Sequence, residues 1–300
     1  MIPFPEAKRV IYKTNPIVEL ICEFRFPRIL KINENEPVEF QERIRTKYPI
    51  NKITSGHQGQ VTIEMSNNTV DAPLPRFSHS EEKIKNHQFF SADNTLMVNL
   101  NSTSLSIATQ KYEKWEKFSP QINEVLGIFV DIYKPAFYER IGLKYVDAIQ
   151  KSKLNLNNKT PWGKLVKPHT AGYFANKELA QFVKNYMSTV EIDIDEGAVA
   201  QIRTFLAHVT DMKKTIPVGP SEIAFIIISD LFFLRKDLEN AAKSVDYLHS
   251  VAYRLLRSII TDKLHNAMGL QKYDNTNTTA KNVYRRIRTK YAVYKNQHKF

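Results

Sequence analysis

Three acidic residues near the middle of the chain form the clearest group that could carry catalysis. Glu191, Asp193 and Asp195 alternate with aliphatic residues in the segment VEIDIDEG. On a β-strand, alternate side chains lie on one face about 7 Å apart, and carboxylate oxygens are the ligands that Mg²⁺ prefers. A metal pair held there could hydrolyse a phosphodiester bond, although a sheet with one face in water explains the same alternation. The segment therefore predicts either a metal-dependent nuclease or other phosphoryl enzyme, or a solvated sheet face.

The other residues that could do chemistry favour structural roles. Cys22, the single cysteine, alternates with the apolar residues Leu20 and Phe24, so burial should raise its pKa and keep it a thiol. No two of the eight histidines have the i, i+4 spacing of a helical zinc pair, and His249 lies beside an apolar helix stripe, where a hydrogen-bonded structural role is favoured. Nucleotide-binding glycine motifs and a GxSxG segment are absent. We therefore expect no cofactor.

Positive charge is concentrated at the end of the sequence. The chain has 43 basic and 31 acidic residues, for a net charge of +12, and residues 281–300 contain seven of the basic residues and no acidic one. Val283, Ile287, Tyr291 and Tyr294 recur at helical spacing among these charges, which predicts a basic amphipathic helix.

Such a helix fits several partners. Arginine and lysine would contact phosphates and tyrosines would stack on bases, so nucleic acid is one candidate partner. An acidic protein, an anionic membrane surface, and packing on the body or on a second subunit of a homodimer are the others. The residues expected to contact nucleic acid are Lys281, Tyr284, Arg285, Arg286, Arg288, Lys290, Tyr291 and Lys295.

The composition limits the class of protein. Of 300 residues, 42% are hydrophobic, as in a globular chain. The longest apolar run, at residues 223–228, is far shorter than the roughly 20 residues of a membrane span. The first residues lack the basic and apolar regions of a secretory signal, and a lone cysteine fits a reducing compartment. We expect a cytoplasmic protein without a membrane span.

Hydrophobic periodicity predicts an α+β fold in which antiparallel sheets pack against long helices, in two similar-sized parts, followed by the basic helix. Residues 66–87 read as a polar connection that follows a strand at 60–65 and a turn at 56–59. The other expected strands cover 17–26, 88–90, 95–99, 104–109, 137–149, 187–195, 198–209 and 222–233, and the expected helices cover 38–48, 112–133, 177–185 and 238–268.

Residues 151–170 are polar and are interrupted by Pro161, Gly163 and Pro168, which is typical of a domain boundary. This predicts an N-terminal α+β domain over 1–150, a C-terminal α+β domain over 151–270 and a basic tail over 271–300.

One glycine stands inside a predicted strand. Gly142 in ERIGLKY indicates a bulge or a close approach of another group to the backbone. Arg140 and Lys144 share its face, which could therefore contact an anion or simply face water.

Three segments carry a resemblance. YKTNPIVELICEFRF, FYERIGLKYVDAI and DYLHSVAYRLLRSIITDKLHNAMG occur in this order, and the chain thereby resembles, over most of residues 12–270, a sporadically distributed bacterial family of uncharacterised function. The resemblance implies a bacterial cytoplasmic protein encoded near mobile-element or defence genes, and it supplies no catalytic residues. We expect a non-catalytic binding protein, a nucleic-acid- or partner-binding component of a phage-defence or mobile-element system, with the nuclease as the alternative.

Overall fold

The computed structural model describes residues 2–64, 76–209, 222–234 and 240–273. The expected basic helix at 281–300, with all eight residues proposed to contact nucleic acid, lies outside these ranges.

One large sheet organises the molecule, and the α+β prediction is confirmed at this level. Nine strands pair antiparallel throughout, so that the chain forms hairpins and meanders. Their order across the sheet is β3 (Ile50–Glu64), β4 (Arg76–Phe90), β5 (Leu96–Leu100), β6 (Ser104–Thr109), β2 (Ile17–Arg25), β7 (Arg140–Ile149), β10 (Glu222–Phe233), β9 (Ala198–Val209) and β8 (Met187–Asp193).

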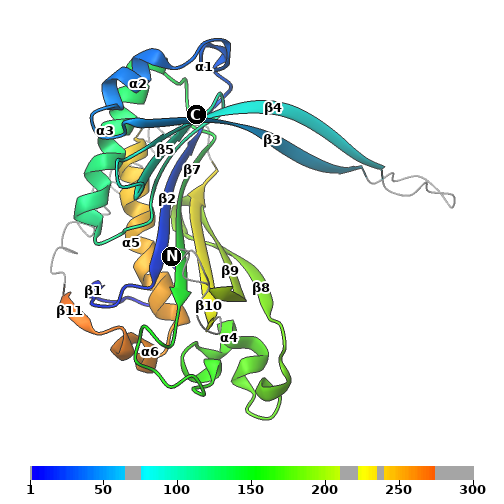
Figure 1. Ribbon diagram of the computed structural model, residues 1–300. Coiled ribbons are helices and arrows are strands. Elements are labelled where there is room, and N and C mark those ends of the chain that lie inside the picture. Colours follow the sequence, from blue (N-terminus) through cyan, green and yellow to red (C-terminus); the bar gives the residue numbers. More distant parts are fainter. Residues whose placement is uncertain (1, 65–75, 210–221, 235–239, 274–300) are drawn as a thin grey trace, which may run out of the picture.

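Two helices of 19 residues, α3 (Trp115–Tyr133) and α5 (Ala241–Ile259), cover one face of this sheet (Figure 1). Shorter helices complete the described chain: α1 (Leu30–Glu34), α2 (Val38–Ile44), which packs on α3, α4 (Pro168–Ala171) and α6 (Asp262–Ala267). Near the ends of the described chain, β1 (Val10–Tyr12) and β11 (Leu270–Tyr273) pair as a separate two-stranded sheet. Among the described residues, none of the helices combines the length and the apolar character that crossing a membrane requires.

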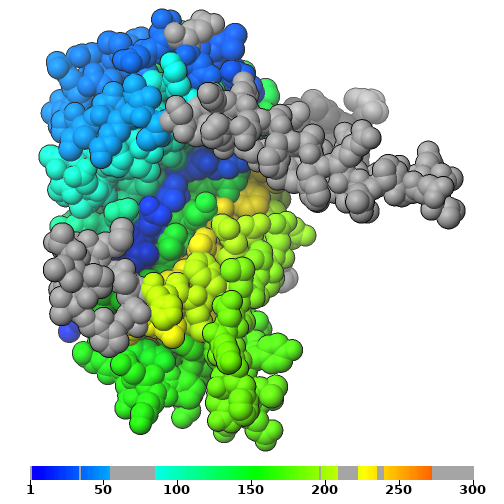
Figure 2. Space-filling view, turned by 45° about the vertical axis from the view of Figure 1, so that its right-hand side comes forward, coloured from blue at the N-terminus to red at the C-terminus, as the bar shows by residue number. Residues whose placement is uncertain are grey.

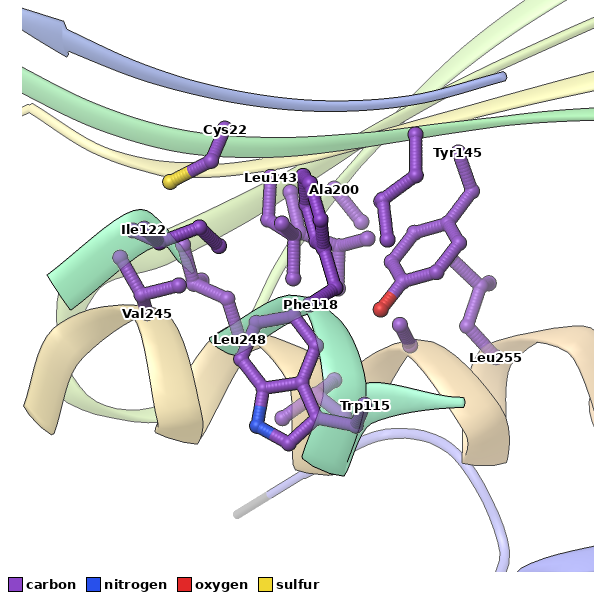
Figure 3. Packing of buried hydrophobic residues seen from close by; sticks show 14 of the residues in the cluster. Cys22, Trp115, Phe118, Ile122, Leu143, Tyr145, Ala200, Val245, Leu248 and Leu255 are labelled. Atoms are coloured by element: carbon purple, nitrogen blue, oxygen red, sulfur yellow. The ribbon is translucent and has the colours of Figure 1, made fainter. Parts of the chain in front are cut away.

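The hydrophobic core lies between the sheet and these two helices. Figure 3 shows Cys22 and Leu143 directed from the strands toward Ile122 of α3 and Leu248 of α5. All four are buried, because alternation sends one face of each strand inward while the 3.6-residue period keeps one stripe of each helix apolar. Burial raises the pKa of the Cys22 thiol, as expected.

Strands from both sides of residue 150 belong to the same sheet. β7 ends at Ile149 and pairs with β2 on one side and with β10 on the other. The segment that follows β7 turns back to the end of α5, where Val166 forms a bridge with Ile260.

Three expected elements were wrong in detail. Of the expected helix at 177–185, the structure has only a 3₁₀ turn, Ala180–Phe182. The expected helix at 238–268 is two helices, because Ile260 is extended and the Thr261 side chain accepts a hydrogen bond from the Leu264 amide to cap α6. Residues 76–87, expected as a connection, belong to β4, which pairs with β3 in a long ribbon that includes the expected turn at 56–59 and extends beyond the helices (Figure 1).

Candidate functional site

The three carboxylates that suggested a metal site are not brought together. β8, the edge strand that carries Glu191 and Asp193, ends at Asp193, and Asp195 begins a single 3₁₀ turn. Both strand residues are exposed, which fits the alternative interpretation of a solvated face. Among the described residues, no three histidine, cysteine, aspartate or glutamate side chains form a group that could hold a metal ion.

Arg140 lies on the sheet face that α3 and α5 do not cover, and its guanidinium contacts carboxylates. Its Nη1 donates to Glu23 at 2.5 Å and its Nη2 donates to Asp230 at 2.6 Å, while Phe232 lies beneath the guanidinium at 4.5 Å. Figure 2 shows the strands β2, β7 and β10 recessed in a hollow of this face. Both terminal nitrogens of Arg140, which was expected to face an anion or water, therefore donate to carboxylates of the protein itself.

Gly142 explains how Arg140 reaches both partners. A Cβ at Gly142 would lie 2.2 Å from Nη1 of Arg140, so the side chain crosses directly over the glycine backbone. The expected close approach is thus made by a side chain of the same strand.

The helix-covered face contains a cavity that the sequence did not indicate. It measures about 70 Å³, counted as the space open to the centre of a water molecule. It lies between the N-terminal segment, the residues that precede α3, the strands β7 and β10, and α5. The residues whose side chains give it polar or aromatic character are Arg9, Tyr12, Asn15, Tyr112, Glu113, Lys114, Tyr145, Asp147, Ser229, His249 and Tyr253.

Asp147 is the buried acid of this cavity. It is 3% exposed and pairs in register with Ile227 of β10 and Ile17 of β2, in the middle of the sheet. Among the described residues, its Oδ1 has no hydrogen-bond partner. Burial raises the pKa of Asp147 to about 7 because desolvation disfavours the charged form.

Hydrogen bonds hold the aromatic walls in place. The Tyr145 hydroxyl lies 2.7 Å from Nδ1 of His249, and Figure 3 shows this tyrosine reaching from β7 toward α5. His249 stacks on Trp115 with ring centroids 4.1 Å apart, so it has the hydrogen-bonded, packed position that was expected for it. The Tyr12 hydroxyl makes the corresponding contact with Nδ1 of His265, also at 2.7 Å. Burial raises the pKa of Tyr12 and of Tyr145, so both phenols stay neutral.

At the wall formed by the N-terminal segment, a cation is already paired. Nη1 of Arg9 donates to Oε1 of Glu116 at 2.6 Å. The cavity therefore combines neutral tyrosines, the imidazole of His249, the guanidinium of Arg9 paired with Glu116, and the buried carboxyl group of Asp147.

The sequence did carry a weak signal for this site. In the segment FYERIGLKYVDAI, Asp147 occupies the face shared by Leu143, Tyr145 and Ile149. An acid on the apolar face of a strand is unusual, because burying a carboxyl group without a partner is unfavourable.

Comparison with known proteins adds no assignment: no family model matches the chain, and no curated protein matches it.

Proposed function

We propose that this chain is a non-catalytic binding protein that holds a small ligand in the Asp147 cavity. The observation that supports the proposal is that Asp147 lines the cavity while its buried Oδ1 has no hydrogen-bond partner among the described residues. An unsatisfied buried acceptor costs about 1–3 kcal/mol. A ligand that donates a hydrogen bond to this oxygen would offset that cost.

The walls support binding because they are formed in advance. Tyr12, Tyr145 and Arg9 are each held by another side chain of the protein, so little order has to be gained when a ligand enters. Ligand sites in proteins share this combination of apolar walls and a few fixed polar groups.

Catalysis by Asp147 is the second candidate function. A carboxyl group with a pKa of about 7 can accept and return a proton near neutral pH. Conversion of the ligand on incubation would favour this function over simple binding.

The first test is to find a bound ligand and to block its site. We expect native mass spectrometry of the full chain from its host to show a bound small molecule. Adding this molecule to the ligand-free protein should raise the melting temperature in thermal unfolding. Ala252→Leu places a larger side chain on the cavity wall of α5 and should weaken binding at least about tenfold, because the added atoms occupy the ligand's space.

Ala242→Leu is the matched control, since it makes the same change on α5 at a residue that does not line the cavity. Equal ligand affinity in both variants, or the absence of any bound small molecule, would contradict binding in this cavity.

We also propose that the basic tail binds nucleic acid or an acidic protein. The support is the sequence: residues 281–300 hold seven basic residues and no acidic residue. A role in phage defence or in a mobile element is a further proposal, and it depends on the family resemblance alone.

The tail is best removed after Tyr273, because β11 pairs with β1, whose residues line the cavity. We expect the truncated chain to bind a DNA or RNA probe at least about tenfold more weakly in gel-shift titrations, with a shallower dependence on salt, because fewer phosphates are neutralised. Equal affinity of the two chains would eliminate the tail as the binding element.

A further inference from the structure

We infer that the ligand of the Asp147 cavity carries a primary ammonium group, which the buried carboxylate and the surrounding aromatic rings recognise together. This inference rests on the proposed function and specifies the chemistry of its ligand.

The buried carboxylate, once ionised, favours a hydrogen-bond donor with positive charge. Oδ1 of Asp147 lacks a hydrogen-bond partner among the described residues. An ammonium group would donate a hydrogen bond to this oxygen and would also neutralise the negative charge of the carboxylate. An anionic ligand would be repelled by Asp147. A quaternary ammonium carries charge but has no N–H to donate, so a primary amine fits better.

The cations near the cavity do not replace the ligand. Arg9 and Lys114 line it, but Arg9 is bound by Glu116, and no ion pair joins either cation to Asp147 in the part of the chain that the structure describes. Burial alone therefore determines the state of this carboxyl group when the cavity holds no cation.

The walls suit an organic cation. Tyr12, Tyr112, Tyr145 and Tyr253 line the same space, and the face of an aromatic ring attracts an ammonium group. The cavity volume of about 70 Å³ exceeds the roughly 10–15 Å³ that one water molecule needs. A short alkylamine such as n-propylamine is therefore a suitable probe.

Recognition by a carboxylate makes binding depend on pH. Asp147 must be ionised to pair with the ammonium group, and burial holds its pKa at about 7. n-Propylamine itself stays protonated in this range, as a lysine side chain does. The other titratable groups that line the cavity are Arg9, Tyr12, Tyr112, Glu113, Lys114, Tyr145, His249 and Tyr253.

The experiment is a calorimetric titration of the full chain with n-propylamine and with its neutral isostere n-propanol. We expect n-propylamine to bind about 30-fold more tightly at pH 8.5 than at pH 5.5, because affinity changes about tenfold per pH unit below the pKa of Asp147. At the higher pH, n-propanol should bind at least about tenfold more weakly than n-propylamine.

Two variants separate Asp147 from the other groups. Asp147→Asn should remove both the preference for the amine and its increase with pH, whereas Asp131→Asn, which makes the same change in an exposed ion pair with Arg43, should leave them unchanged. A pH dependence that persists in Asp147→Asn would assign it to another group, such as His249, and overturn the inference.

The remaining outcomes distinguish this inference from the proposed function. Binding of n-propanol that matches the amine and weakens as the pH rises would overturn the ammonium group but keep a ligand in the cavity. Tighter binding of choline than of n-propylamine would overturn the primary amine in favour of a quaternary one. If no probe binds while a native ligand sensitive to Ala252→Leu is found, only the inference fails; if no ligand is found either, both fail.

Discussion

Replacing Arg140 by alanine is expected to lower the free energy of unfolding by about 3–5 kcal/mol. The Arg140 side chain is 11% exposed and is the shared partner of Glu23 and Asp230 on neighbouring strands. Without it, two carboxylates would stay close together on the sheet, and the nearest remaining cations would be partly exposed: Lys144, 3.7 Å from Asp230, and Arg25, 3.1 Å from Glu23. Urea denaturation of the variant and the wild type at neutral pH measures this loss.

Arg25→Ala is the matched control, because Arg25 donates to the same carboxylate of Glu23 but its side chain is 51% exposed. An ion pair in water contributes less than about 1 kcal/mol. If the two alanine variants lose the same stability, the burial of Arg140 has no special value.

Gly142 provides a second check on the same network. Gly142→Ala should destabilise the wild type by about 1–3 kcal/mol, because the new methyl group would push the guanidinium away from its partners. In the Arg140→Ala background this cost should fall close to the small intrinsic difference between glycine and alanine. A double-mutant cycle measures the coupling.

Alternation in the sequence predicted most of the strands that form the centre of the sheet. In β2, Leu20, Cys22 and Phe24 are buried while Glu23 and Arg25 face the other side. This local pattern is reliable because one face of the strand contacts the helices and the other does not. Residues 76–87 show no regular alternation of polar and apolar residues in the sequence. They are therefore recognised as part of a strand only from the pairing of β4 with β3.

Contacts between distant segments could not be predicted from local patterns. The break between α5 and α6 lies where Val166 forms a bridge with Ile260, and Arg140 reaches Asp230 because β7 pairs with β10. The apolar stripe predicted one helix through Ile260, because periodicity within a helix does not show where a distant segment packs against it.

The candidate site was missed for the same reason. Its acid lies on β7, its imidazole on α5 and its guanidinium in the N-terminal segment, so no spacing along the sequence relates them. The predicted acidic row at 191–195 was easy to recognise, because its residues are close together in the sequence. Its alternation is explained by a solvated edge strand alone.

Asp147→Asn is expected to stabilise the protein in a way that grows with pH. The pKa of Asp147 is about 7 in the folded protein and 3.8 as the ordinary value, so the folded state holds a proton that the unfolded chain has already lost. The stability that this group contributes is fully present below about pH 4 and is lost as the pH rises through 7. Above pH 7 the full penalty is about 4 kcal/mol, from about 1.36 kcal/mol per pKa unit.

The measurement is the free energy of unfolding of both proteins from pH 5.5 to 8.5. Over this range the advantage of Asp147→Asn should increase by about 2 kcal/mol, since the rest of the penalty is already present at the lower pH. Asp131→Asn, at a side chain that is 64% exposed, should show a difference from the wild type that is small and independent of pH. A constant advantage of Asp147→Asn would mean that Asp147 is ionised throughout this range.

The pH-dependent penalty and the proposed binding have the same cause. A buried carboxylate without a counter-ion lowers stability, and a bound ammonium group would restore it. Saturating n-propylamine should therefore raise the melting temperature of the wild type more at pH 8.5 than at pH 5.5, because a ligand that binds only the folded state stabilises it according to its affinity. In Asp147→Asn the amine should have no such effect, so the substitution that makes the free protein more stable should also remove its response to the ligand.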